Sequence, residues 1–333
     1  MIRFKRKAAD SIRPKIFQSI LCVFMAVLLI AGCSSSSSSS KYPEKPIQLV
    51  VSYSPGAATD TQARIIAKYA KKYLGQELNI INKPGGGGQV GWNYFSSVQP
   101  DGYILSVYNL PHIITQPLVG DTSYKMETFE PIINWGQDPT VFAVSAESDI
   151  TSLEDLVKKA EQSPDQITIG NAGKFVGQHM AILLLEQAAG IQVKDVPYKG
   201  SSEAIASLLG KHTQVISGNL SDMYRLGEEI QMLAIASEER HAFAPEVPTF
   251  PELGYPEVVM STDRGIAAPK GTPPDIIKKL ETVFLELLKD EDFLADMEKA
   301  GADLLILDRE SVQKEFKIRY EMYEELLKTV DID

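Results

Sequence analysis

Residues 46–74 read PIQLVVSYSPGAATDTQARIIAKYAKKYL, and this stretch decides the fold class. The mostly apolar run from Pro46 to Ser54 is typical of a buried strand. Apolar residues then recur at helical spacing from Ala58 to Leu74, and Gly75 follows as a stop signal, so a helix is expected there. A strand that leads into a helix through a short turn of small residues is the repeating unit of an α/β protein.

The same alternation of strands and helices continues along the chain. Further strands are expected at Glu77–Asn82, Tyr103–Asn109, Gln166–Ile169, Gln192–Pro197, Thr213–Ser217 and Met232–Ala236. Helices are expected at Val176–Ala189, Ser202–Leu209, Pro273–Lys289 and Glu310–Val330. This order predicts parallel sheets covered by helices, with the last two helices packed on the outside of an earlier part of the fold.

The length of the chain predicts two lobes. About 290 residues follow a serine-rich segment near the N-terminus, which is more than one hydrophobic core usually organises. Because no second linker follows, the chain is expected to cross between the lobes within strands, at Pro131–Val144 and Val258–Ala268. We therefore expect residues 43–143 plus 264–333 to form lobe 1 and residues 144–263 to form lobe 2.

The N-terminal segment predicts export and lipidation. Six Lys or Arg residues precede Ile20–Ile30, an apolar stretch of eleven residues. This stretch is shorter than the roughly 20 residues that span a bilayer, and it suits a secretory signal peptide. Ala31-Gly32-Cys33 resembles the lipobox of bacterial lipoproteins, which predicts a signal peptide over residues 1–32 and an acylated Cys33; an ordinary signal peptide with an incidental cysteine is the alternative. Seven serines follow, so residues 33–42 are expected to form a lipidated, flexible tether.

Charge and cysteine content exclude several functions. Residues 1–32 hold six basic residues and one acidic residue, so their removal shifts the formal charge from −11 to −16. Such an acidic body is a poor partner for nucleic acid, although the field inside a cleft is set locally. Both cysteines, Cys22 and Cys33, lie in the N-terminal segment, which leaves the mature body without a disulfide or a thiol nucleophile.

Three strand-to-helix turns share one design: Ser54–Asp60, Gly170–His179 and Pro197–Ser202. Each leads from the carboxyl end of an expected strand into the N-terminus of an expected helix. Helix N-termini present free N–H groups and a partial positive charge, which attract carboxylates and phosphates. Ligands of α/β proteins gather at the carboxyl ends of strands, although every α/β protein contains several such turns.

Residues for catalysis or metal binding do not assemble in the sequence. Lys83-Pro84 and Gly85–Gly88 lack the Gly-Lys-Ser/Thr end of a phosphate-binding loop, so a glycine-rich turn that brings backbone close to the cleft is the better interpretation. The four histidines are not at metal-ligand spacing, and there is no Gly-x-Ser-x-Gly nucleophile elbow. We therefore expect no catalytic residues, no metal and no cofactor.

Two residues keep more than one interpretation. His179 opens the helix after the second turn, and it is either structural or close to a ligand. Arg264 lies in an otherwise apolar crossing strand, where arginine rarely stays unpaired. It either forms an ion pair with a nearby acid such as Asp263 or acts as a bidentate clamp for a ligand carboxylate.

With these residues the chain resembles the solute-binding receptors of tripartite tricarboxylate transporters, the Bug receptors. The matching stretches are Tyr42–Ile47, Pro55–Asp60, Asn82–Gly85, Pro100–Tyr103, Gln178-His179, Val196–Ser201, Pro245–Thr249 and Ala268–Pro273. The resemblance implies a two-lobed periplasmic-binding-protein fold of the Venus-flytrap type II, with the ligand held between the lobes. It also implies capture of a small organic acid or amino acid and its delivery to the subunits of a membrane permease.

The resemblance also implies which residues meet the ligand. The turn Ala57–Asp60 matches the family's carboxylate cradle in the first lobe, and the turns Lys174–Gln178 and Gly200–Ser202 match the contributors from the second. The candidate ligand-binding residues are Tyr53, Ala57, Ala58, Thr59, Asp60, Lys174, Val176, Gly177, Gln178, Gly200, Ser201, Asn219 and Arg264.

The chain departs from the family pattern at three places. Ala57 stands in place of a glycine, Val176-Gly177 stand in place of Thr-Ser, and Arg264 stands in place of an aromatic residue. Two hydroxyl donors are thereby lost, and Arg264 is expected to compensate by gripping the carboxylate directly.

Two other functions share the predicted features. A lipoprotein that senses a ligand and signals to a partner would have the same fold, and an exported hydrolase is a further alternative without an identifiable nucleophile. The ligand stays open among monocarboxylates, dicarboxylates, citrate-like acids and amino acids. The anchored body is expected to act as a monomer in the cell envelope, facing either a periplasm or the outside of a Gram-positive cell.

Overall fold

A computed structural model describes residues 42–330 of the chain. The expected signal peptide, the acylated Cys33 and the serine tract fall in residues 1–41 and lie outside the described residues. The chain from Pro43 onward forms one compact unit. Within the described residues, no helix is both long and apolar enough to cross a bilayer.

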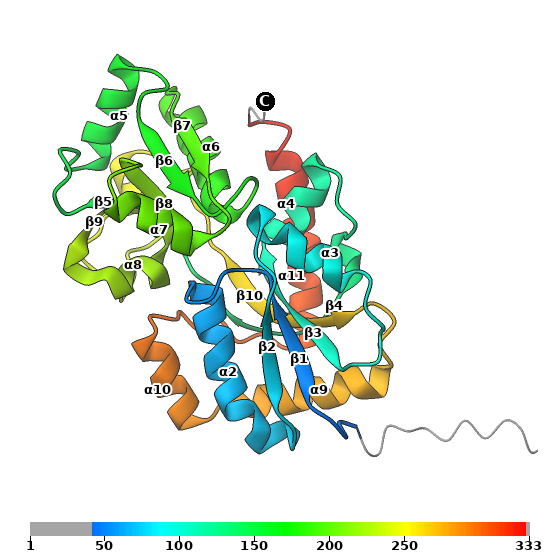
Figure 1. Cartoon of the computed structure of the whole chain (residues 1–333). Coiled ribbons are helices and arrows are strands. Elements are labelled where there is room, and N and C mark those ends of the chain that lie inside the picture. Colours follow the sequence, from blue (N-terminus) through cyan, green and yellow to red (C-terminus); the bar gives the residue numbers. More distant parts are fainter. Residues whose placement is uncertain (1–41, 331–333) are drawn as a thin grey trace, which may run out of the picture. The chain divides into compact units, whose positions relative to one another are not determined.

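Two five-stranded sheets form the centres of two lobes (Figure 1). The first sheet has the strand order β2 (Leu78–Asn82), β1 (Ile47–Val51), β3 (Ile104–Leu110), β10 (Asp263–Pro269) and β4 (Phe129–Gly136). The second has the order β7 (Lys194–Pro197), β6 (Thr168–Asn171), β8 (Val215–Asn219), β5 (Thr140–Ser145) and β9 (Ile230–Ile235). In each sheet four strands are parallel to one another, and one, β10 or β5, runs antiparallel to both of its neighbours. The prediction of parallel sheets is correct for four strands of each sheet and wrong for the fifth.

The antiparallel strand of each sheet is the one that arrives from the other lobe. The chain crosses first between β4 and β5, at residues 137–139, and it returns just before β10. β10 enters beside Leu110, the last residue of β3, and β5 enters beside Asn219, the last residue of β8. Because both strands start where their neighbours end, they must run in the opposite direction.

The two crossing segments, residues 137–140 and 260–262, pair with each other, and we call them the hinge. Thr140 N donates to Met260 O at 2.9 Å, and Thr262 N donates to Asp138 O at 2.8 Å. The hinge therefore lies beside the carboxyl ends of the parallel strands in both sheets.

The start of β5 also bears on the boundary between the lobes. The sequence places that boundary between residues 143 and 144, but β5 pairs with β8 from Thr140 onward. Residues 140–143 thus belong to the second sheet. Asp263 begins β10 of the first sheet, so we propose that residues 140–262 form lobe 2 and that, among the described residues, 43–139 plus 263–330 form lobe 1.

Helices cover both sheets. In the first lobe, α2 (Ala58–Leu74) packs on β1 and β2, α3 (Gln89–Phe95) and α4 (His112–Val119) on β3, and α9 (Pro274–Leu287) and α11 (Arg309–Leu326) on β4, while α10 (Glu291–Lys299) packs on α2. In the second lobe, α6 (Gly177–Ala189), α7 (Ser201–Leu209) and α8 (Leu220–Leu226) pack on the sheet, and α5 (Leu153–Gln162) precedes β6. The C-terminal helices thus return to the first lobe, as the sequence predicts.

The sequence of α2 shows how these contacts arise. Ala63, Ile66, Ala70 and Leu74 are buried, and their spacing of three or four residues puts them on one face of the helix. Gly75 ends the helix in a left-handed conformation with φ 72°, and its N–H bonds to Lys71 O. The bounds predicted from the sequence are those of the structure.

Gly265 in β10 leaves no room for a side chain. A Cβ at this position would lie 2.1 Å from Tyr108 Oη and 2.2 Å from Ile133 O. Gly265→Ala is therefore expected to lower the free energy of unfolding of the first lobe by about 1–3 kcal/mol, because the sheet must shift to admit the methyl group.

Urea unfolding followed by tryptophan fluorescence measures this effect, since Trp92 and Trp135 are both buried in the first lobe. Gly120→Ala is the matched control: its Cβ would meet only Gln116 O, at 3.6 Å, and its φ of −145° suits alanine. Equal unfolding midpoints for the two variants would contradict the prediction.

Candidate functional site

A pocket lies where the carboxyl ends of strands from both sheets meet. The pocket is small and largely enclosed by the residues of the two lobes. Its lining residues are Tyr53, Ala57, Ala58, Thr59, Asn109 and His112 from the first lobe and Ala172, Gln178, Ser201 and Asn219 from the second. None of these ten side chains is that of Asp, Glu, Lys or Arg.

Among the helices that start at this pocket, α2, α6 and α7 follow the three turns singled out in the sequence, and they start without a capping side chain. The N-cap residues of α2, α6 and α7 are Ala57, Val176 and Gly200, and none of these residues caps its helix with a side-chain hydrogen bond. Among the described residues, side chains cap α5, α10 and α11, namely Ser152, Asp290 and Asp308, whereas α3, α4, α8 and α9 also lack such a cap. The first N–H groups of a helix have no intrahelical acceptor. The pocket helices therefore keep donors for another partner.

Three polar side-chain atoms of the pocket also lack a hydrogen-bond partner among the described residues. Asn109 Oδ1, His112 Nδ1 and Gln178 Oε1 are buried and make no hydrogen bond within the described part of the chain. Buried polar atoms are normally satisfied, and each one that is not costs about 1–3 kcal/mol. Together with the helix N–H groups, these atoms mark the pocket as a place for a polar ligand.

Two aromatic residues keep the pocket wall neutral. Burial, together with the nearby charge of Arg264, lowers the pKa of His112 to about 3. Burial raises the pKa of Tyr53 well above its ordinary value. The Tyr53 ring packs edge to face against Trp92 and His112, and its Oη donates to Gly87 O at 3.2 Å. A neutral wall does not repel an anion.

Contacts between the lobes close the pocket on both sides. Arg225 of α8 donates to Thr61 Oγ1 at 3.0 Å and to Gly56 O at 3.4 Å, at the turn before α2. On the other side, the backbones of Gly87 and Gly173 approach so closely that a Cβ on Gly173 would lie 2.7 Å from Gly87 Cα. The glycine-rich turn predicted to bring backbone close to the cleft does so here.

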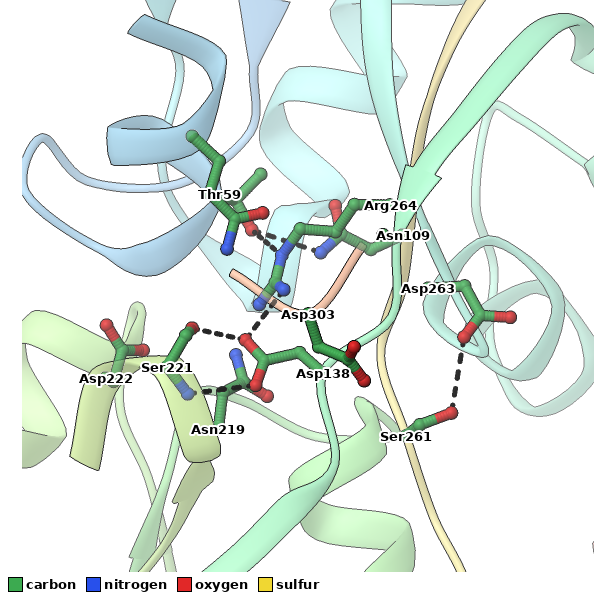
Figure 2. Close-up of polar contacts among 12 residues, drawn as sticks. Thr59, Asn109, Asp138, Asn219, Ser221, Asp222, Ser261, Asp263, Arg264 and Asp303 are labelled. Carbon is green, nitrogen blue, oxygen red and sulfur yellow. Dashed lines mark hydrogen bonds and ion pairs between the residues drawn. The ribbon is translucent and has the colours of Figure 1, made fainter. Parts of the chain in front are cut away.

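Arg264 is not among the residues that line the pocket, and its side chain lies between Thr59 and Asp138 (Figure 2). Its Nε donates to Thr59 Oγ1 at 3.0 Å, and its Nη1 pairs with Asp138 Oδ2 at 2.7 Å. Its ion-pair partner is thus Asp138 and not Asp263, which pairs with Arg319. With Nε and Nη1 occupied, only Nη2 lacks a partner among the described residues. The bidentate grip on a ligand expected from the sequence is therefore not formed in this arrangement.

The structure brings seven of the thirteen candidate residues into the pocket lining. These are Tyr53, Ala57, Ala58, Thr59, Gln178, Ser201 and Asn219. Val176 and Gly200 are the N-caps of α6 and α7, and Gly177 is the first residue of α6, so these three lie at the starts of helices and not in the lining itself.

Asp60 and Lys174 lie outside the lining. Asp60 Oδ2 accepts from Gly56 N and pairs with Arg64, both at 2.9 Å, so this carboxylate shapes the turn before α2. Lys174 pairs with Asp195 at 2.7 Å, and its side chain is half exposed.

The sequence profile of one family, described as Tripartite tricarboxylate transporter family receptor, matches residues 62–328, which is most of the chain. The chain belongs to this family. The predicted resemblance is confirmed, and the family is one of solute-binding receptors and not of enzymes.

Known relatives cover nearly the same span of this receptor. The UPF0065 protein in the gbd 5′ region of Cupriavidus necator is 32% identical over 282 residues, 82% of this chain and 84% of that protein. Protein BugT of Bordetella pertussis is 31% identical over 295 residues, 86% of this chain and 90% of BugT. The solved structure of periplasmic binding protein BugD has a TM-score of 0.81 at 29% identity, covering 86% of this chain and 98% of BugD. The predicted two-lobed binding-protein fold is therefore confirmed.

Asn109, His112 and Ala172 line the receptor pocket but are not among the thirteen residues predicted from the sequence. Asn109 ends the strand predicted at Tyr103–Asn109, and a polar residue at the carboxyl end of a strand is the signal that could have found it. His112 opens α4, whose sequence HIITQPLV has no clear polar face and so gives no helical periodicity.

His179 holds the turn that precedes α6. Its Nδ1 accepts from Phe175 N at 3.1 Å, so Nε2 carries the proton, and this nitrogen lies 3.5 Å from Asp195 Oδ2. Phe175 has φ 54°, a left-handed conformation that is costly for a bulky residue. The contacts favour the structural interpretation of His179, which stabilises this strained turn.

The buried His179 makes the stability of the receptor depend on pH. Burial lowers its pKa to about 4 in the folded protein, against 6.5 for an unperturbed histidine. As the pH falls, the unfolded chain takes up this proton first, so the free energy of unfolding is expected to drop by about 3 kcal/mol between pH 6.5 and about 4 from this residue alone. In His179→Gln, whose amide can still accept from Phe175 N, the slope is expected to be smaller.

Urea unfolding at several pH values between about 4 and 7 measures the slope. The exposed His212 supplies the control, because His212→Gln should keep the wild-type pH dependence. A wild-type slope in His179→Gln would show that the buried imidazole does not carry the effect.

Proposed function

We propose that this receptor captures a small organic carboxylate outside the cytoplasm and delivers it to a tripartite tricarboxylate-type membrane permease. The observation that carries the proposal is the convergence of the uncapped N-termini of α2, α6 and α7 on one pocket. A carboxylate offers acceptors to several N–H groups at once, and the partial positive charge of each helix end attracts it. α2 belongs to the first lobe and α6 and α7 to the second, so a bound carboxylate would hold the lobes together.

A related structure supports a carboxylate as the ligand class. A protein of R. palustris, 27% identical to this chain with a TM-score of 0.81, was solved with adipate, and the match covers 86% of this chain. We therefore propose a mono- or dicarboxylate, with one carboxylate at the N-terminus of α2.

From the sequence, we further propose that residues 1–32 act as a signal peptide, that Cys33 carries a lipid anchor, and that the serine-rich tether holds the receptor as a monomer at the cell envelope. The receptor binds without turnover, because the pocket lining offers neither an activated nucleophile nor a carboxylate for acid–base work.

A thermal-shift screen tests the ligand class. Residues 43–333, which form one compact unit, are mixed with acetate, succinate, adipate, citrate or aspartate, and separately with the corresponding amides. A ligand at about 100 times its Kd adds about 2.7 kcal/mol of stability, which raises the midpoint by several degrees. A shift with a carboxylate and none with its amide is expected; no shift with any acid, or equal shifts with acid and amide, contradicts the proposal. Loss of uptake of the same acid in cells that lack the receptor tests delivery to a permease.

Ala58→Pro tests the role of the helix N–H groups directly. Proline is tolerated at the first position of a helix, and Ala57 already has the extended conformation, φ −67° and ψ 159°, that proline requires before it. The change therefore removes one N–H from the pocket. The Kd of the carboxylate is expected to rise about tenfold or more, since a hydrogen bond to a charged group contributes about 1.5–3 kcal/mol.

The matched control for this variant is Glu291→Pro at the first position of α10. Glu291 is exposed, and α10 begins away from the pocket, where Asp290 caps it. Calorimetric titration should give the wild-type Kd for this control. An unchanged Kd in Ala58→Pro would show that the N-terminus of α2 does not hold the ligand.

A further inference from the structure

Arg264 belongs to a buried network that runs from the pocket to the second lobe (Figure 2). Its side chain is 1% exposed, and it joins Thr59 in the first turn of α2 to Asp138 in the hinge. Asp138 Oδ1 accepts from Ser221 N, at the start of α8, at 3.0 Å, and Asp138 Oδ2 also accepts from Ser221 Oγ. Four side chains thus connect the first-lobe wall of the pocket to a helix of the second lobe.

The hydroxyl of Thr59 is the end of this network that faces the ligand site. It accepts two hydrogen bonds, from Arg264 Nε at 3.0 Å and from Asn109 Nδ2 at 3.2 Å. Both partners are N–H donors, so the proton of the hydroxyl points to neither of them. Since Thr59 lines the pocket, its proton is left for an acceptor there. A hydroxyl that already accepts bonds, one of them from a cation, is also a stronger donor.

Asp138 is the acid that neutralises Arg264. The other acids near the guanidinium have partners of their own, because Asp263 pairs with Arg319 and Asp222 pairs with Arg225. The positive charge of Arg264 nevertheless reaches the pocket, since it contributes to the lowered pKa of the lining residue His112.

We infer that Arg264, held by Asp138, is a positioning residue that orients the Thr59 hydroxyl as a hydrogen-bond donor to the ligand carboxylate. This inference rests on the proposed function of the pocket. In this arrangement Arg264 acts on the ligand through Thr59 and does not bind it directly. Because Asp138 is bonded to Ser221, the orientation of a first-lobe donor depends on a second-lobe contact.

A double-mutant cycle tests this role in residues 43–333. One change is Thr59→Val, which removes the hydroxyl and keeps the branched shape. The other is the paired replacement of Arg264→Met with Asp138→Asn, which leaves no buried ion unpaired and keeps an oxygen that can accept from Ser221 N. The Kd is measured by calorimetry with the tightest binder among acetate, succinate, adipate, citrate and aspartate.

The paired replacement is expected to raise the Kd about 10- to 100-fold when Thr59 is present, but less than about threefold in the Thr59→Val background. Thr59→Ser keeps the hydroxyl and should stay within about threefold of the wild type. A merely structural role would raise the Kd by the same factor in both backgrounds. That result overturns the inference, and so does a wild-type Kd in the paired replacement.

Arg264→Lys provides a second route if the paired replacement does not fold. Lysine keeps the charge and can pair with Asp138, but its single ammonium has no second nitrogen for Thr59. It is expected to raise the Kd about tenfold with Thr59 present and to add little in the Thr59→Val background, whereas equal factors overturn the inference. If the wild-type chain binds none of the five acids, the proposed function is overturned as well. If the wild-type chain binds an acid but the effects of the two changes on the Kd simply multiply, only the inference about Arg264 is overturned.

Discussion

The N–H groups at the starts of α2, α6 and α7 need an acceptor, and the residues at their N-caps do not supply one. Buried donors without an acceptor cost about 1–3 kcal/mol each. One of these helices lies in the first lobe and two lie in the second, so a single anion can satisfy all three only when the lobes are together. The groups that bind the ligand are therefore the groups that favour closure, and affinity and conformation are linked through one set of hydrogen bonds.

The position of the hinge explains why the pocket and the Arg264 network are neighbours. β5 and β10 enter their sheets beside the carboxyl ends of parallel strands, which is where α/β proteins bind ligands. The residues at these entries, among them Asp138 and Arg264, are thus placed next to the pocket by the topology. Two bonds from Arg264 are then enough to join Thr59, at the ligand site, to Asp138, in the hinge.

The features of this architecture that depend on neighbouring residues were predicted from the sequence. The features that depend on residues distant in the sequence were not. The bounds of α2 follow from its apolar face and from Gly75, because both signals lie in the segment itself. The directions of β5 and β10 depend on where the chain re-enters a sheet, which alternation of strands and helices does not encode. The same limit applies to the site: the turns before α2, α6 and α7 were found from small residues after strands. The partner of Arg264 was not found, because Asp138 is distant in sequence and the adjacent Asp263 faces Arg319.

A buried arginine in a receptor for anions raises the question of release. The net charge of −11 does not determine how the ligand is released, because exposed charges are screened beyond about 8 Å at physiological ionic strength. If Arg264 held the ligand directly, release would leave an unpaired cation in a buried site, at a cost of several kcal/mol. Paired with Asp138, the guanidinium keeps its partner whether the pocket is full or empty. The ligand then meets a hydroxyl and backbone N–H groups, which bind an anion less tightly than a full positive charge does. A receptor built in this way can hold a carboxylate firmly enough to capture it and still give it up to a permease.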